Sequence, residues 1–96
     1  MIVLIIYDIT DDNLRNKVAN TLLAYGLTRV QKSAFLGPLT RERLKDLKVR
    51  LNRMIQEQRA NIQFYPLCPH CYIRRDEIGI PTVPRYPIRE EAVIIV

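Results

Sequence analysis

The feature that most constrains the fold is the longest uninterrupted apolar run of the chain, Met1 to Tyr7. A short continuous run that is rich in β-branched residues is typical of a central strand buried on both faces. It is far shorter than the roughly 20 apolar residues that a membrane-spanning helix needs. It also lacks the basic segment and the small-residue cleavage site of a signal peptide. The sequence therefore predicts a cytoplasmic protein, with no membrane contact, built around this strand.

The length and the charge of the chain limit what it can do. A chain of 96 residues can bury one hydrophobic core but not two independent ones. Hydrophobic residues make up 48% of the chain and charged residues 26%, which is usual for a folded protein. Fifteen Lys and Arg against ten Asp and Glu leave a net charge of +5. This excess favours a polyanionic partner, nucleic acid first.

A helix is predicted directly after the first strand. Thr10 or Asp11 can cap its free backbone N–H groups, and Gly26 follows its last turn as the expected C′ residue. The apolar positions that recur at helical spacing are Leu14, Val18, Leu22 and Tyr25, with Ala19 and Leu23 beside them. One face of this helix should therefore pack against the strand.

The rest of the first 68 residues predicts more strands and a second helix. Residues 29–36 alternate as in a strand that ends at Gly37-Pro38, and Thr40 then caps an amphipathic helix. The apolar stripe of that helix contains Leu44, Leu47, Leu51, Met54 or Ile55, and Gln58. Ile62 to Leu67 predicts a further short strand. Residues 29–39 have room for one bent strand or for two short ones.

This order of elements predicts an α+β or α/β fold, with helices layered on one sheet. We place the core in residues 1–68 and a proline-rich arm in residues 69–96, where Pro81, Pro84 and Pro87 keep the chain extended. The arm ends in an apolar run, Ala92 to Val96, which predicts a final strand. An unpaired apolar strand is a liability, so we expect it to pair with the sheet edge of another subunit.

Asp8 is the first candidate for chemistry, and two interpretations are open. A carboxylate at the end of a buried strand can hold a hard cation such as Mg²⁺, or it can help to cap the helix that follows. One carboxylate cannot form a metal site alone, so the first interpretation requires a second copy across a two-fold axis. Asp11 and Asp12 are interpreted as caps and solvated acids.

Basic residues are candidates for contacts with a nucleic-acid backbone, because guanidinium and ammonium groups pair with phosphate. The candidates are Arg15, Lys17, Arg29, Arg41, Arg43 and Lys48. The alternative is the solvated polar face that any amphipathic helix needs. We favour phosphate contacts for Arg15 and Arg29, which bracket Asp8, and the solvated face for the residues of the second helix.

The remaining chemical groups are an aromatic residue and a cysteine pair. Phe35 is interpreted as part of the core or of a subunit interface. Cys68 and Cys71 enclose Pro69 and the single histidine, His70. Free thiols, a disulfide and a zinc site shared across a dimer are all compatible with this spacing. The flanking residues look like a loop, which argues against a redox pair at a helix start.

Four stretches of the chain match a known family in order and spacing. They are Ile5 to Asp12, Arg15 to Ala19, Tyr25 to Gly37, and Phe64 to Cys68. Together they resemble the small CRISPR-associated Cas2 family, over about residues 1–71. The resemblance implies a ferredoxin-like β-α-β-β-α-β domain in a symmetric homodimer, in which an extra C-terminal strand pairs with the partner subunit's sheet.

The resemblance also implies a site and a function. Asp8 matches an aspartate that faces its copy across the dimer axis and binds Mg²⁺, and Tyr7, Arg15, Arg29 and Phe35 match family residues associated with activity. Lys17 stands where relatives carry a second arginine, and it lacks the bidentate fork of that residue. The implied activity is that of a metal-dependent endonuclease on RNA or on double-stranded DNA. The implied alternative is a DNA-binding bridge between two integrase dimers of the Cas1 type during spacer acquisition.

Overall fold

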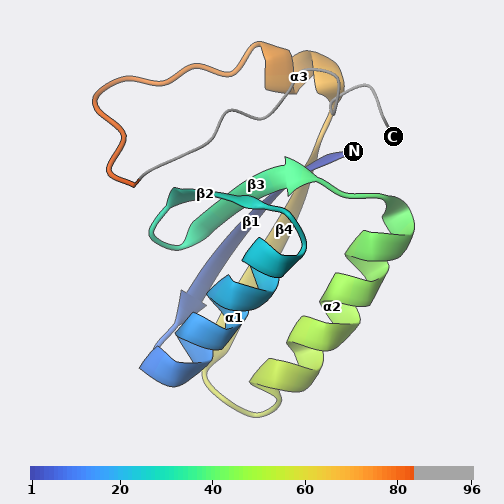
Figure 1. The fold of residues 1–96 in the computed structure, drawn as a ribbon, viewed down its shortest axis with the longest axis vertical. Coiled ribbons are helices and arrows are strands. Elements are labelled where there is room, and N and C mark those ends of the chain that lie inside the picture. The colour runs from blue at the N-terminus through green and yellow to red at the C-terminus, as the bar shows by residue number, and fades with distance from the viewer. Residues whose placement is uncertain (84–96) are drawn as a thin grey trace.

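The computed structural model describes residues 1–83, which contain four strands and three helices (Figure 1). The elements in chain order are β1 (Ile2–Ile9), α1 (Asp12–Ala24), β2 (Thr28–Gln31), β3 (Ala34–Pro38), α2 (Arg41–Ile55), β4 (Ala60–Leu67) and α3 (Pro69–Ile73). No helix among these residues is long and apolar enough to cross a membrane. The predicted final strand, Ala92 to Val96, lies outside the described residues.

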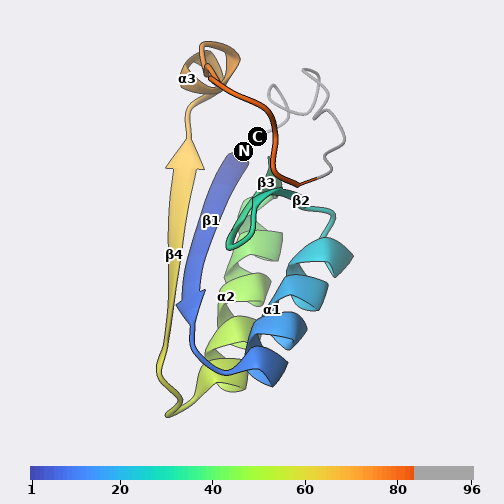
Figure 2. The ribbon, with the colours of Figure 1, turned by 90° about the vertical axis from the view of Figure 1, so that its left-hand side faces the viewer.

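The four strands form one antiparallel sheet in the order β2-β3-β1-β4, with β1 at its centre. Helices α1 and α2 both lie on one side of this sheet (Figure 2). In each β-α-β half, a strand of the other half lies between the two strands: β3 lies between β1 and β2, and β1 lies between β3 and β4. This is the split arrangement of a ferredoxin-like fold. The predicted α+β class and topology are therefore confirmed.

The central strand is buried on both faces only at its first residues, Ile2 and Val3, so the expectation of two buried faces is wrong for most of its length. Val3, Ile5 and Tyr7 point toward the helices and are at most 3% exposed. On the opposite face the described residues form no helix layer along the strand, and Ile6 there is 39% exposed. We call the side of the sheet away from α1 and α2 the open face. Ile6 shares this face with Tyr65, which is 44% exposed, and neighbouring exposed apolar side chains are typical of a surface that association covers.

Helix α1 begins and ends as predicted. The Asp11 carboxylate accepts a hydrogen bond from the backbone N–H of Leu14 at 2.8 Å. At the other end Gly26 has φ +83°, and the N–H groups of Gly26 and Leu27 donate to the carbonyls of Leu23 and Leu22. This is a Schellman motif, in which glycine adopts the left-handed conformation without strain. The Leu23 side chain, expected beside the core, is 52% exposed.

Residues 28–38 form two strands, so the alternative of a single bent strand is wrong. The turn between β2 and β3 contains only Lys32 and Ser33, and a register shift follows Arg29. Strand β3 passes so close to the end of α1 that a Cβ atom at Gly37 would lie 2.8 Å from the Leu27 side chain and 3.2 Å from its Cα. Glycine at this position therefore lets the hairpin reach the sheet.

The arm predicted to be extended from residue 69 begins with a short helix instead. Cys68 is the N-cap of α3, and Pro69 occupies the first helical position, where its missing N–H costs nothing. Tyr72 is 2% exposed and packs on Ile2, with Leu36 and Leu67 at the side. This contact covers one end of the open face, so α3 packs on the sheet through Tyr72.

Candidate metal and nucleic-acid site

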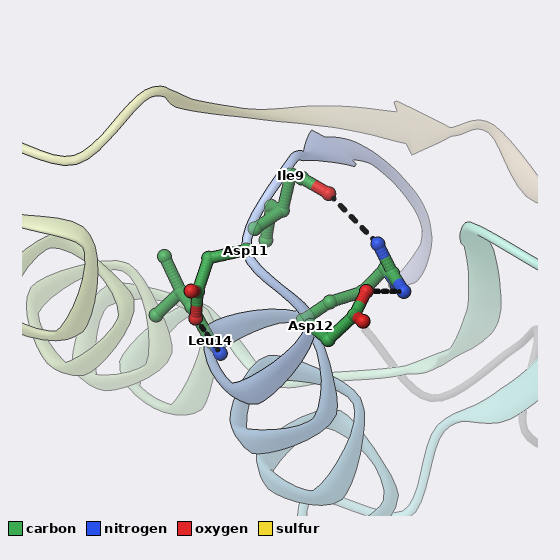
Figure 3. A network of polar contacts seen from close by, with 5 residues as sticks. Ile9, Asp11, Asp12 and Leu14 are labelled. Carbon is green, nitrogen blue, oxygen red and sulfur yellow. Dashed lines mark hydrogen bonds and ion pairs between the residues drawn. The ribbon is translucent and has the colours of Figure 1, made fainter.

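Asp8 lies on β1 opposite Asn61 of β4, and its carboxylate is exposed. Within residues 1–83 no hydrogen bond or ion pair engages this carboxylate. The interpretation that Asp8 caps the helix is wrong, because Asp11 fills that role (Figure 3). Strand alternation instead directs Asp8 to the same open face as Ile6. Asp8 is thus a solvent-facing acid without a partner among residues 1–83.

Arg15 lies next to the end of β1. Its guanidinium donates to the carbonyl oxygen of Ile9 at 3.2 Å and forms an ion pair with Asp12, one turn back on the helix. Figure 3 shows Asp12 and Ile9 at this junction between strand and helix. The Arg15 guanidinium is therefore held at the carbonyl of Ile9, the residue that follows Asp8. The described contacts include none between the side chains of Arg15 and Asp8.

Tyr7, Phe35 and Arg29 form a second group, on the helix side of the sheet. The rings of Tyr7 and Phe35 lie 6.1 Å apart and nearly parallel, and the Arg29 guanidinium lies 5.1 Å from the centre of the Phe35 ring. The Tyr7 hydroxyl donates to the carbonyl of Lys32 at 3.2 Å. Phe35 is fully buried and Tyr7 is 3% exposed, so neither ring is available to a substrate. Both instead act as positioning residues for Arg29 and for the hairpin turn.

Arg29 carries the one buried side-chain nitrogen or oxygen atom in the described chain that lacks a hydrogen-bond partner, its Nε. A buried donor without a partner costs about 1–3 kcal/mol, and a phosphate oxygen could satisfy it. The five residues expected at the site thus fall into separate places: Asp8 on the open face, Arg15 at the strand end, and Arg29 behind the hairpin with its two supporting rings.

The other basic candidates lie on the helices. Lys17 and Arg41 are exposed, with no side-chain contact among the described residues. The Arg43 guanidinium lies 5.0 Å from the centre of the Tyr25 ring, and the Lys48 ammonium lies 5.4 Å from that of Phe64. Tyr25 is the C-cap residue of α1, and Phe64 lies on β4. Arg43 and Lys48 therefore occupy opposite flanks of α2, one toward α1 and the other toward β4.

Sequence reasoning missed a cluster around Tyr25. Arg50 lies 5.6 Å from the centre of the Tyr25 ring, and the Tyr25 hydroxyl donates to the Asp46 carboxylate. This hydrogen bond, together with burial, raises the pKa of Tyr25 above its ordinary value. The spacing of Arg43, Asp46 and Arg50 by three and four residues places them on one helix stripe, and that signal was available in the sequence.

The site offers a magnesium ion one carboxylate ligand, that of Asp8. The described residues contain no group of three His, Cys, Asp or Glu side chains that could surround a metal. Mg²⁺ usually keeps several waters and takes only one or two carboxylates, so an exposed, unpartnered Asp8 fits as one of its ligands. A second carboxylate would have to come from another copy of the chain, as a two-fold axis at the open face would provide.

Residues 1–75 match a family model described as CRISPR associated protein Cas2. A protein of Pyrobaculum aerophilum named CRISPR-associated endoribonuclease Cas2 2 is 41% identical over 85 residues, 88% of this chain and 93% of that protein. A Thermoproteus tenax protein named CRISPR-associated endonuclease Cas1/endonuclease Cas2 fusion is 38% identical over 96% of this chain and 32% of the fusion. The crystal structure of Streptococcus pyogenes Cas2 at pH 6.5 superposes with a TM-score of 0.71 at 32% identity, over 82% of this chain and all of that one.

Proposed function

Since the chain belongs to the Cas2 family of CRISPR-associated proteins, we propose that it is a metal-dependent endonuclease that cleaves phosphodiester bonds in RNA or in double-stranded DNA. Relatives of similar length carry the name endoribonuclease, which supports this reaction class. The observation that carries the proposal is Asp8, an exposed carboxylate at the end of the central strand that has no partner in the described part of the chain. An acid left free in this way is suited to a ligand rather than to the fold.

In this proposal two chains associate through their open faces, so that their Asp8 carboxylates hold Mg²⁺ together. A Mg²⁺ ion held by these carboxylates would supply a coordinated water of lowered pKa and would neutralise charge on the phosphodiester. Arg15, at the end of the strand, binds a phosphate oxygen near Asp8, and Arg29, on the helix side of the sheet, binds a phosphate farther along the nucleic acid, where its buried Nε gains a partner. Tyr7 and Phe35 keep the Arg29 guanidinium in place by stacking. Among residues 1–83 no side chain near Asp8 is an evident general base, so the activity should be modest.

A second function is favoured by the Thermoproteus tenax relative, in which Cas1 and Cas2 are one chain. That fusion supports a partnership with a Cas1-type integrase during spacer acquisition, with this chain as a DNA-binding bridge. The basic side chains on α1 and α2 would contact the duplex in this role, and Asp8 would be dispensable. The nuclease and the bridge therefore differ in their dependence on one carboxylate.

The decisive variant is Asp8→Asn, which removes the charge with little change in shape. We expect Mg²⁺-stimulated cleavage of single-stranded RNA and duplex DNA to fall by on the order of 100-fold or more, the effect of disturbing a metal site. Binding of the same nucleic acids, measured by fluorescence anisotropy, should not weaken. Glu57→Gln is the matched control, because Glu57 is also exposed and without a partner in the described chain but lies in the loop after α2.

Unchanged cleavage by Asp8→Asn would remove the nuclease proposal. Spacer acquisition measured in cells with the same two variants separates the two functions. Loss of both cleavage and acquisition favours a catalytic role in adaptation, whereas loss of cleavage alone favours the bridge.

A further inference from the structure

Cys68 and Cys71 lie where a strand gives way to a helix. Strand β4 ends at Leu67, Cys68 is the N-cap of α3, and Cys71 is its third helical residue. Figure 2 shows α3 directly beyond the end of β4. The loop expected around this pair, which argued against redox chemistry, is therefore absent, and the geometry is the one that such chemistry uses.

The two cysteines face each other across the first turn of α3. The backbone N–H of Cys71 donates to Cys68 Sγ at 3.4 Å, so the Cys68 sulfur takes the place of a capping oxygen. The side chains of an N-cap residue and of the third helical residue are neighbours in the same way in a capping box. Pro69 fixes the backbone between them. Both thiols are free and exposed, so small molecules can reach them.

The same contacts make the two thiols unequal. Hydrogen bonds from the Cys71 backbone N–H, above all, and from the Cys71 thiol lower the pKa of Cys68. The hydrogen bond to Cys68 and the charge on its sulfur raise the pKa of Cys71. A thiolate is the nucleophile in disulfide exchange. Cys68 is therefore suited to attack, and Cys71 to resolve the product.

We propose that Cys68 and Cys71 form a redox-active dithiol that exchanges with disulfides of the glutathione type, a site separate from the nuclease residues. The Cys68 thiolate attacks one sulfur of the disulfide RSSR, forms a mixed disulfide and releases RS⁻. Cys71 then gives its proton to solvent and attacks Cys68 Sγ, which expels a second RS⁻. The protein dithiol loses two electrons and becomes a disulfide, and RSSR gains them to become two RSH after protonation.

The element that this reaction constrains is α3. A bond between Cys68 and Cys71 fixes its first turn, and the next residue, Tyr72, covers Ile2 at one end of the open face. A zinc site is the competing use of two thiolates and His70. The described residues supply no set of three His, Cys, Asp or Glu side chains that could surround a metal, so the exchange reaction is the better match.

The experiment follows the thiols of the whole chain by mass spectrometry during incubation with oxidised glutathione. The wild type should end with an internal disulfide and no glutathione adduct. Cys71→Ser should stop at a stable adduct on Cys68. Cys68→Ser keeps a good N-cap residue and so the fold, and its remaining Cys71 should react about tenfold more slowly than Cys68 does in Cys71→Ser, as expected for a thiol without a lowered pKa.

Three results would overturn the proposal. The wild type could keep both thiols free in excess oxidised glutathione, or the two single variants could react at equal rates. Alternatively, stoichiometric Zn²⁺ could bind the reduced wild type and protect both thiols from alkylation, which would make the pair a metal site. Circular dichroism of each variant shows that it is folded, so that a slow reaction reflects the thiol and not the loss of α3.

Discussion

At the scale of single residues, Tyr7 links the core to the hairpin that carries Arg29. Its ring stacks on Phe35 inside the core. Its hydroxyl donates a hydrogen bond to the carbonyl of Lys32, and its backbone N–H donates one to the carbonyl of Ser33. The β2–β3 turn is thus attached to the central strand by two hydrogen bonds. The hydroxyl of Tyr7 matters because it is a polar group at the rim of an otherwise apolar cluster.

We predict that Tyr7→Phe lowers the free energy of unfolding by about 1 kcal/mol, the usual net value of one hydrogen bond, because the ring and its stacking are kept. Amide exchange at Lys32 and Ser33 should become faster. Thr82→Val is the control: its hydroxyl donates to Gln31 on the surface and the residue is exposed, so chemical denaturation should detect almost no change. Equal effects of the two variants would contradict this role for Tyr7.

The sequence predicted which residues carry charge at the site better than it predicted their surroundings. Asp8 was recognisable because it interrupts an apolar strand, and the Asp11 cap because it precedes a helical repeat. Tyr7 and Asp8, as neighbours on a strand, must point to opposite faces of the sheet, but the sequence could not show which of the two faces the helices would cover. Phe35 was associated with the site, yet its burial follows from its position opposite Ile5 in the register.

At the scale of secondary structure, the β2–β3 hairpin was the uncertain element. Alternation over residues 29–36 does not reveal where a strand turns, because a two-residue turn and a bulge preserve much of the pattern. Helix α3 was missed for a related reason: proline was taken as a helix breaker, although it is favoured at the first helical position. The choice left open at the hairpin and the missed helix both concern local turn chemistry rather than hydrophobic pattern.

Helix α2 carries the nucleic-acid prediction. The variant Arg41→Gln/Arg43→Gln/Lys48→Gln removes three charges but keeps long side chains over Tyr25 and Phe64. If all three contact phosphates, the negative slope of log K against log salt for duplex DNA should become shallower by about 2.7, since each lost contact contributes about 0.9. Binding measured by fluorescence anisotropy from low to high salt tests this.

The flanks of α2 allow a finer comparison. Arg43 and Lys48 lie on opposite sides of the helix, so one duplex need not contact both. Single variants should then differ, with a reduced slope for the residue on the bound flank alone. An unchanged slope in the triple variant would mean that these side chains form only a solvated face.

At the scale of the whole molecule, the sheet has one face covered by two helices and one that is open (Figure 2). The open face combines apolar side chains with a free acid, since Leu4, Ile6 and Asp8 alternate along β1 beside Tyr65 of β4. A single chain leaves Ile6 39% and Tyr65 44% exposed. The long apolar run of β1 predicted a strand with two buried faces, and a second copy of the chain could bury the open face.

We therefore predict that the open face is a two-fold interface and that Ile6→Asn weakens it. An amide buried there without a partner costs about 1–3 kcal/mol, and two-fold symmetry places it in the interface twice, so the dissociation constant should rise by about 30-fold or more. Asparagine adds no charge beside Asp8, so a concurrent loss of Mg²⁺-stimulated cleavage would arise from separation of the two carboxylates. Leu23→Asn is the control, because Leu23 is 52% exposed on the helix side of the sheet and should leave self-association unchanged. Sedimentation velocity over a range of concentrations measures both variants. If Ile6→Asn self-associates like the wild type, the open face is not the interface, and a shared metal site at Asp8 loses its physical basis.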